Sequence, residues 1–315
     1  MTFFNNLHRG LEENGMRLDA GQSSLMEKSL TALLAGIQET VYSEAIAQQI
    51  LPVAAALGTG LTSIEFYRGV PTGEMQLIGA TANDLPRIDE SLVKTERPVA
   101  NYGASFGWSL IEFERAQRQN FSFEARRAMQ ARQIAERHID AIVFGESDPN
   151  RSDIKGLFGD ALSAASGLTG GWATATETQI LDDVQLILDA GYQGSGGEVI
   201  PDSLILPSEE YGLLKYKMRA NTDSNLLEIV QNKLGVSVYR SARLNSVTSA
   251  TNSLSAAPTA VAFKRDPMIV ELQIPRPFQL RPGQWRGLEY CVDFLLDFSG
   301  VFNYLPSSFG LGDLS

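Results

Sequence analysis

The side chains that most often carry catalysis are scarce in this sequence. Its 315 residues include two histidines, His8 and His138, and one cysteine, Cys291. Zinc hydrolases need clustered ligands, as in His-Glu-x-x-His, and serine triads need a histidine beside the nucleophile. We interpret His138, which stands among charged residues of a helical pattern, as a surface or interface histidine. The sequence therefore predicts no catalytic residue and no metal site.

Two glycine-rich segments, 167–171 and 194–197, have the glycine content of a phosphate-binding loop. A P-loop also needs a following Lys-Ser or Lys-Thr pair between a strand and a helix, and neither segment has one. Asp182 and Asp183 are neighbours on a predicted helix, so their side chains point about 100° apart and do not form a shared carboxylate site. We expect no cofactor and no enzymatic activity.

Composition narrows the class of protein further. With 26 basic and 37 acidic residues, the net charge is -11, which disfavours wrapping nucleic acid through phosphate neutralisation. A single cysteine excludes disulfides within the chain and suits a reducing cytoplasm. Residues 1–9 lack the pattern of a secretory signal. The longest uncharged stretch, 244–263, is polar and contains Pro258, so we expect no membrane span.

The strongest strand pattern lies near the C-terminus. Between Trp285 and Phe298 apolar and polar residues alternate almost without a break, which predicts one half-buried strand of roughly 45 Å at about 3.3 Å per residue. A matching alternation runs from Met268 to Ile274, and Arg281-Pro282-Gly283 favours a turn between the two runs. We predict a long antiparallel ribbon with Val292 and Phe294 in its core and a structural role for Cys291.

The first part of the chain predicts an arm followed by an extended hairpin. Ser23 or Ser24 is a suitable N-cap for a helix, a second apolar group stops at Pro52, and the small residues of 54–60 suggest a hinge. Residues 61–107 contain short β-prone pieces separated by glycine and proline. They lack enough apolar residues for a core of their own, so we expect them to lean on another surface.

A long helix is expected next, beginning after Ser122 and ending near Phe144. Its apolar face carries Ala125, Ala128, Met129, Ala135, Ile139 and Ile142. Its opposite face is charged and carries Arg126, Arg127, Arg132, Glu136, Arg137 and Asp140. This face is either an ordinary solvated surface or a stripe that contacts a partner. The three tryptophans, Trp108, Trp172 and Trp285, are interpreted as packing anchors.

Residues 195–265 alternate helices and strands and predict a compact α+β insert. Just before this insert, Thr174-x-x-Glu177 has the pattern of a capping box at the start of a helix. Asn225-x-x-Glu228, within the insert, has the same pattern and predicts the start of another helix. A helix is also expected from Ser208. Strands are expected at 203–206, 236–240 and 259–263.

The order of these elements, α+β in class, resembles the major capsid proteins of tailed bacteriophages, with the Hong Kong 97 type fold. The resemblance is carried by Glu44 to Val53, Phe106 to Phe113, Gly156-Leu157-Phe158-Gly159, Trp172 with Thr176 and Ile180, and Pro201 to Pro207 with Tyr211. It implies an N-terminal arm at 1–60, an extended hairpin loop at 61–107, a peripheral domain with a spine helix at 108–194, an axial domain at 195–265 and return strands at 266–315.

The resemblance also implies a function. Such subunits assemble in the host cytoplasm into pentamers and hexamers of an icosahedral virion shell, which encloses double-stranded DNA without sequence-specific binding. The resemblance suggests scaffold, portal and decoration proteins as partners, and it implies no contact with a membrane. The predicted hairpin agrees with this assembly, because without a core of its own it needs a contact with a neighbouring subunit. A heterologous contact of this kind, repeated by rotation, closes into a ring.

Candidate subunit-interface residues lie in the hairpin and on the spine helix. They are Phe66, Arg68, Arg87, Lys94, Arg97, Arg126, Arg132 and Arg137. Some relatives join hairpin lysines to asparagines of a neighbour by isopeptide bonds. Lys94 is the only hairpin lysine and 276–286 contains no asparagine, so we expect a non-covalent shell. The arm is shorter than the scaffolding segment of some relatives, which implies a separate scaffold or a chain already trimmed.

Two other classes remain open. An encapsulin-like compartment shares the fold but encloses a cargo enzyme. An unrelated cytosolic enzyme with an acidic surface is disfavoured because no site is apparent in the sequence.

Overall fold

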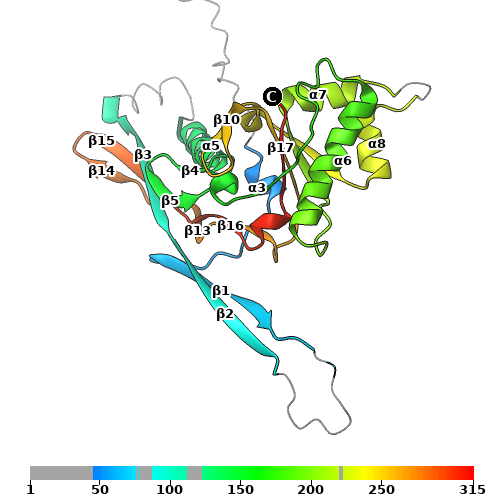
Figure 1. The fold of residues 1–315 in the computed structure, drawn as a ribbon. Coiled ribbons are helices and arrows are strands. Elements are labelled where there is room, and N and C mark those ends of the chain that lie inside the picture. The colour runs from blue at the N-terminus through cyan, green and yellow to red at the C-terminus, as the bar shows by residue number, and fades with distance from the viewer. Residues whose placement is uncertain (1–44, 76, 78–86, 112–122, 220–222) are drawn as a thin grey trace, which may run out of the picture. The chain divides into compact units, whose positions relative to one another are not determined.

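The computed structural model describes residues 45–75, 77, 87–111, 123–219 and 223–315. All of them fall in one of the two units of the chain, Glu44–Ser315 (Figure 1). The predicted helix near Ser23 and Ser24 lies outside the described residues. Among those residues, no helix is long and apolar enough to cross a membrane.

The C-terminal ribbon is built around β15 (Glu289–Phe298). One edge pairs along its whole length with β3 (Ala100–Ser109), and the other with β13 (Arg276–Leu280) and β14 (Gln284–Arg286). Beyond a short break, β12 (Val270–Gln273) pairs with β16 (Gly300–Asn303). An antiparallel ribbon is therefore present, with β15 as its central strand. The predicted pairing is wrong, because β12, from the run Met268 to Ile274, pairs with β16 rather than with β15, and residues 281–283 separate two strands, β13 and β14, that both pair with β15.

The prediction of one strand from Trp285 to Phe298 is wrong. Arg286 pairs with Glu289, so Gly287 and Leu288 form a two-residue hairpin loop, and Gly287 has a φ of 68°. Such loops need a residue with positive φ, which glycine adopts at no steric cost. Trp285 and Leu288 are consequently exposed by 55% and 72%. Trp285 is not the packing anchor that its residue type predicted, whereas Trp108 and Trp172 are buried.

The predicted spine helix is α5 (Phe123–Val143). Ala135, Ile139 and Ile142 are buried as predicted, but Met129 is exposed. The elements that contact α5 most extensively are α3 (Ala47–Ile50), β4 (Ser147–Asp148) and β16. Which side chains of α5 are buried therefore depends on these neighbouring elements as well as on the apolar stripe.

A second sheet has the order β6-β17-β11-β7-β8. Its strands are β6 (Ser163–Ala164), β17 (Gly310–Asp313), β11 (Thr259–Phe263), β7 (Ser203–Pro207) and β8 (Ser237–Ser241). Helices α6 (Glu177–Gly194), α7 (Ser208–Tyr216) and α8 (Leu226–Lys233) belong to the same unit, and α6 contacts both β17 and β11. The sheet thus includes segments outside the predicted insert at 195–265.

Alternation along these strands divides the protein into two cores. Leu204 and Ala260 pack with residues of α6 and α8, whereas Ile205, Val261 and Phe263 pack with residues of α5 and the ribbon. Successive strand residues point to opposite faces, so one sheet forms a wall of both cores. This explains why β7 and β11 are buried at every position.

The capping box of α6 uses Thr176 and Gln179 rather than the predicted Thr174 and Glu177. Thr174 instead donates its hydroxyl to the Gly171 carbonyl oxygen at 3.3 Å. The predicted start of α8 is confirmed, because the Asn225 side chain accepts a hydrogen bond from the Glu228 amide at 2.8 Å.

The hairpin consists of β1 (Ser63–Thr72) and β2 (Asp89–Pro98), which pair from Ser63 with Pro98 to Thr72 with Asp89. The predicted hairpin boundary at residue 107 lies inside β3, which belongs to the ribbon. Figure 1 shows β1 and β2 extending away from the two sheets.

The segment that was expected to be a hinge is bound to the ribbon. Val53 forms a parallel bridge with Leu272, the Ala54 amide donates to the Leu272 carbonyl at 3.0 Å, and the Gly58 amide donates to the Pro275 carbonyl at 3.2 Å. These backbone hydrogen bonds tie residues 52–58 to β12 and its continuation. The remaining short elements are β5 (Arg151–Lys155), η1 (Leu157–Gly159), η2 (Ala242–Asn245), β9 (Val247–Ser249), β10 (Leu254–Ala257) and η3 (Pro306–Ser308).

Candidate assembly surfaces

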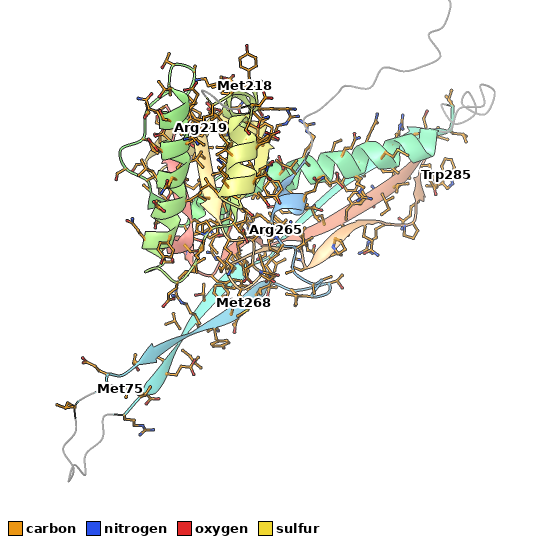
Figure 2. All side chains as sticks on the ribbon, turned by 90° about the vertical axis from the view of Figure 1, so that its right-hand side faces the viewer. Met75, Met218, Arg219, Arg265, Met268 and Trp285 are labelled. Atoms are coloured by element: carbon orange, nitrogen blue, oxygen red, sulfur yellow. The ribbon has the colours of Figure 1, made fainter. Side chains whose placement is uncertain are left out.

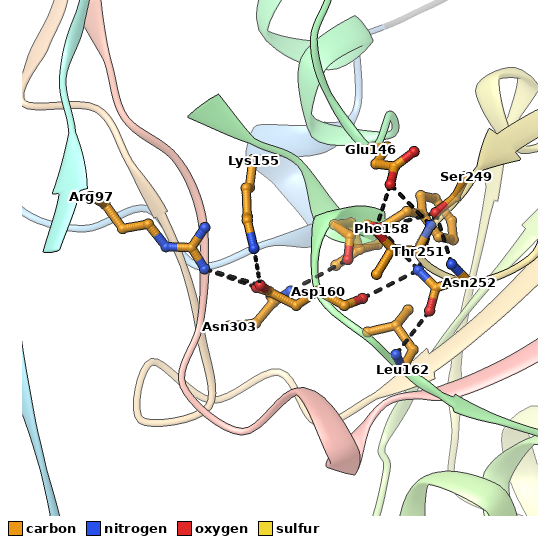
Figure 3. Close-up of polar contacts among 11 residues, drawn as sticks. Arg97, Glu146, Lys155, Phe158, Asp160, Leu162, Ser249, Thr251, Asn252 and Asn303 are labelled. Atoms are coloured by element: carbon orange, nitrogen blue, oxygen red, sulfur yellow. Dashed lines mark hydrogen bonds and ion pairs between the residues drawn. The ribbon is translucent and has the colours of Figure 1, made fainter. Parts of the chain in front are cut away.

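The root of the hairpin packs on the subunit's own body. Phe66 contacts the rings of Phe302 and Tyr304, with centroid distances of 5.5 and 4.9 Å. The Arg97 Nη2 atom lies 2.9 and 3.3 Å from the two carboxylate oxygens of Asp160 (Figure 3). The Arg97 and Asp160 side chains are only 11% and 14% exposed. Phe66 and Arg97 were predicted interface residues, but both are occupied within the subunit.

Beyond the root, the hairpin exposes apolar side chains. Leu92 is 64% exposed, and Tyr67, Ile88 and Val93 are each more than half exposed. A two-stranded ribbon has no core beneath it, and clustered exposed apolar side chains mark interaction surfaces. Arg68 and Arg87 are also exposed along this part of the hairpin.

Lys94 lies on the exposed hairpin and is already paired. Glu65 faces Glu96 directly across the two strands, and the Lys94 Nζ atom contacts the Glu65 Oε1 atom at 2.6 Å. The hydrogen bond that Lys94 donates to Glu65 is the main cause that raises the pKa of Lys94, and the charge of Glu96 adds to it. Lys94 therefore offsets repulsion between two carboxylates within the hairpin, and its interface role stays a prediction.

The predicted basic stripe of α5 divides into residues with different surroundings. Arg132 is exposed and pairs with Glu136 at 2.8 Å, one turn along the helix. Arg127 donates to the Gly107 carbonyl oxygen and its guanidinium lies 5.4 Å from the Trp108 ring centroid. Arg137 is half-buried. The side chain of Arg126 lies outside the described residues. Of these residues, Arg132 presents its charge at the surface.

Asp140 has a structural position, although its spacing in the sequence placed it on the charged face of α5. It is buried, and its Oδ1 atom accepts hydrogen bonds from the backbone amides of Ile46 at 3.0 Å and Ala47 at 3.1 Å. Its Oδ2 atom lies 3.6 Å from the Arg243 Nε atom. Burial is the main cause that raises the pKa of Asp140, while these partners lower it. The end of the arm, the spine helix and η2 therefore meet at one carboxylate.

A second exposed apolar surface lies at the loop between β14 and β15, where Figure 2 shows Trp285. Leu288 of this loop accepts a hydrogen bond from the Leu110 amide at 2.8 Å, and Leu110 and Ile111 are exposed beside it. We name Trp285, Leu288, Leu110 and Ile111 the loop patch. It gathers residues from two distant parts of the chain.

Side chains with catalytic potential have structural partners. His138 is half-buried and its ring packs edge-on against Tyr102, with centroids 4.7 Å apart. Asp183 is buried and accepts a hydrogen bond from the Trp172 indole nitrogen at 2.9 Å, whereas Asp182 is exposed. In the described part of the chain, no group of three or more His, Cys, Asp or Glu side chains could hold a metal ion.

One short motif was overlooked in the sequence. Gly103-Ala104-Ser105-Phe106-Gly107 has the Gly-x-Ser-x-Gly spacing of a hydrolase nucleophile turn. The structure places Ser105 in the middle of β3, where it pairs with Asp293 of β15. A nucleophile turn joins a strand to a helix, and this segment is a continuous strand. Gly107 lies close to the Tyr290 carbonyl oxygen, where an added Cβ atom would be 2.8 Å away.

Comparison with known proteins identifies the family. The sequence profile of the major capsid protein family matches residues 73–314. The chain belongs to the major capsid protein family. No curated protein matches this capsid protein.

Solved structures show that the fold is Hong Kong 97-like and α+β in class, as predicted. The capsid of Myoviridae phage XM1 superposes with a TM-score of 0.77 at 17% identity, covering 95% of this chain and 99% of that chain. A Mycobacterium phage Adephagia structure gives 0.62 at 13% identity, with coverages of 95% and 99%. A virus-like particle from Pyrococcus furiosus gives 0.55 at 14% identity, with coverages of 85% and 92%.

Proposed function

We propose that this capsid protein forms the pentamers and hexamers of an icosahedral tailed-phage shell that encloses double-stranded DNA. Its family supports the structural role, and its fold supports assembly into a shell. The observation that carries the proposal is the hairpin, whose outer part exposes Tyr67, Leu92 and Val93 with no core beneath them. Burial against a neighbouring subunit would remove this apolar surface from water.

The proposed domain assignment follows the two sheets. We assign the unit of the five-stranded sheet with α6, α7 and α8 to the axial domain, which gathers around the symmetry axes. We assign α5 and the ribbon to the peripheral domain, and residues 1–60 to the arm. The axial domain then begins before residue 195 and includes β17 from the C-terminus.

The proposed interface combines the exposed hairpin and the loop patch. Arg68, Arg87, Lys94 and Arg132 are the exposed members of the predicted set. An exposed ion pair contributes at most about 1 kcal/mol, so apolar burial repeated by symmetry must supply most of the association energy.

Replacing residues 67–94 with a Gly/Ser linker tests the assembly role of the hairpin. Phe66 and Arg97 stay in place, so the root keeps its contacts with the body. We expect a soluble subunit that melts cooperatively but forms no shells in electron micrographs. Normal shells from this variant would show that the hairpin is not an assembly element.

A milder change tests the same point without shortening the chain. Leu92→Ser with Val93→Ser removes two exposed apolar side chains from β2, and Ser91→Ala changes the exposed position beside them. We expect the double variant to raise the protein concentration needed for assembly and Ser91→Ala to leave it unchanged.

The enclosed DNA is proposed to contact the shell without sequence-specific binding. The net charge of -11 disfavours tight attachment to phosphates. We expect the isolated subunit to show no measurable duplex affinity at physiological salt. Assembly in the host cytoplasm, and scaffold, portal and decoration partners, belong to the same proposal.

A cargo compartment of the encapsulin type is the second candidate. The likeness to a virus-like particle favours it, although the similarity is lower than to the phage XM1 capsid. The contents of purified shells distinguish the two functions. Packaged DNA supports the phage capsid, and a co-purifying enzyme supports the compartment.

A further inference from the structure

The hairpin is attached to the body of the subunit at its root. The aromatic contacts of Phe66 hold β1, and the ion pair of Arg97 with Asp160 holds β2. The Ser299 hydroxyl adds a hydrogen bond to the Pro98 carbonyl oxygen at 2.7 Å. The described hairpin residues 67–69 and 87–94 are exposed, so the root determines the angle at which the hairpin leaves the body.

Asp160 is the residue of the body that holds the Arg97 side of the root. Its carboxylate also contacts the Lys155 Nζ atom of β5 at 2.8 Å. Its backbone carbonyl accepts a hydrogen bond from the Asn252 Nδ2 atom at 3.2 Å, and the Asn252 Oδ1 atom accepts one from the Leu162 amide at 2.9 Å. Figure 3 shows this chain of contacts from Arg97 through Asp160 to the turn at Asn252. The backbone of Asp160 is thus fixed while its side chain holds the hairpin.

An open groove of about 580 Å³ lies beside the root. One wall is formed by residues 66–69 of the hairpin, and the other by residues of the body that include Pro267, Met268 and Glu271. Figure 2 shows Met268 near the root and Met75 toward the outer end of the hairpin. The hairpin therefore borders a space into which it can move.

We propose that the Arg97–Asp160 ion pair is a releasable latch, and that the hairpin closes over the groove when the pair is broken. The latch is a partly buried contact between opposite charges that holds the hairpin in its extended position. It lies at the root, where a small rotation of the hairpin moves the outer ends of β1 and β2 by a large distance. Its use during shell assembly rests on the proposed function, but closure itself is a property of the single subunit.

Disulfide trapping across the groove tests the latch. Arg68 and Met268 line opposite walls and are both exposed. The protein would carry Arg68→Cys and Met268→Cys with Cys291→Ser, which removes the only natural cysteine. The rate of intrachain disulfide formation is measured in full-length protein, as loss of maleimide-reactive thiols without an increase in mass on a non-reducing gel. This rate is then compared with and without Asp160→Asn.

The matched control is Asp153→Asn. Asp153 forms an ion pair with Arg151 on the same strand, exposed and separate from the hairpin contacts. We expect Asp160→Asn to increase the rate of intrachain disulfide formation about fivefold or more, because a modest change in the free-energy difference between the extended and closed hairpin is enough for that. We expect Asp153→Asn to leave this rate unchanged. Arg97→Gln breaks the same ion pair from the hairpin side, so it must increase the rate as Asp160→Asn does. If Asp160→Asn does not fold, Arg97→Gln takes its place in the comparison.

Equal rates in the latched and unlatched proteins would overturn the proposal, as would an equal increase with Asp153→Asn. Disulfides that only join separate chains would overturn it too, because the two walls then meet between subunits. Electron microscopy of the unmodified chain is scored separately. A chain that forms no shells would count against the capsid function and leave the trapping result intact.

Discussion

Replacement of Asp140 tests whether one buried carboxylate holds the end of the arm. Asp140→Ala leaves the amides of Ile46 and Ala47 without their acceptor. An unsatisfied buried group costs about 1 to 3 kcal/mol, and relief of the buried charge offsets part of that cost. We therefore expect a loss of about 2 to 4 kcal/mol, which corresponds to roughly 30- to 1000-fold in a local equilibrium.

Asp140→Asn is the matched variant, because its amide oxygen can accept the same two hydrogen bonds. It loses the contact with Arg243, which is partly exposed and 3.6 Å away, and a pair of this kind contributes at most about 1 kcal/mol. It also removes the desolvated charge. We expect Asp140→Asn to lie within about 1 kcal/mol of the natural protein.

The pH dependence has a definite sign. Burial raises the pKa of Asp140 above its ordinary value in the folded state. The favourable contribution of this group is therefore fully present below the unfolded-state pKa and is lost as pH rises through the folded-state pKa. Asp140→Asn should gain stability relative to the natural protein as pH is raised across that interval.

Hydrogen exchange of the peptide spanning residues 45–51 measures the local effect, and urea denaturation measures the global one. Faster exchange in Asp140→Ala, with near-natural exchange in Asp140→Asn, is expected. Equal exchange in the two variants would refute the role of Asp140 as the acceptor for the arm.

Three further outcomes are expected. Phe294→Ala should cost about 3 to 5 kcal/mol and give insoluble or unassembled protein, whereas Cys291→Ser should assemble normally; the reverse result would invert their roles. Shells should dissolve to single subunits in boiling denaturing gel buffer, because residues 276–286 contain no asparagine to form a covalent bond with Lys94, and a ladder of covalent multimers would contradict this. Trp285→Ser should leave the melting temperature of the subunit within a few degrees but weaken assembly; unchanged assembly would remove the loop patch from the interface.

Elements with strong local signals could be predicted from the sequence. The strand at 259–263 matches β11, and the helix expected after Ser122 matches α5. The cap at Asn225 was found because a polar side chain hydrogen-bonds amides of the first helical turn, which is a contact between sequence neighbours. The same logic failed at Thr174, because two threonines two residues apart offered competing boxes.

Non-local pairing could not be read in the same way. The alternation from Trp285 to Phe298 continues across Gly287 and Leu288, so a two-residue loop was hidden within a strand pattern. The glycine was the available signal. Strand β17 is short and contains two glycines, and its pairing with β11 connects residues about 50 positions apart in sequence.

The candidate site depends even more on tertiary contacts. Arg97 looked like an exposed hairpin charge until Asp160, 63 positions away, was placed beside it. Asp140 followed the spacing of a solvated stripe, but the arm covers it through residues 93 and 94 positions away. The exposed part of the hairpin was foreseeable, because its lack of a core is a property of composition.

Cryo-electron microscopy of the purified full-length protein tests the central claim most directly. We predict closed icosahedral shells in which the exposed faces of β1 and β2 lie against a neighbouring subunit and cover Leu92 and Val93. A soluble protein that remains monomeric under assembly conditions, or shells in which these residues face solvent, would contradict the account.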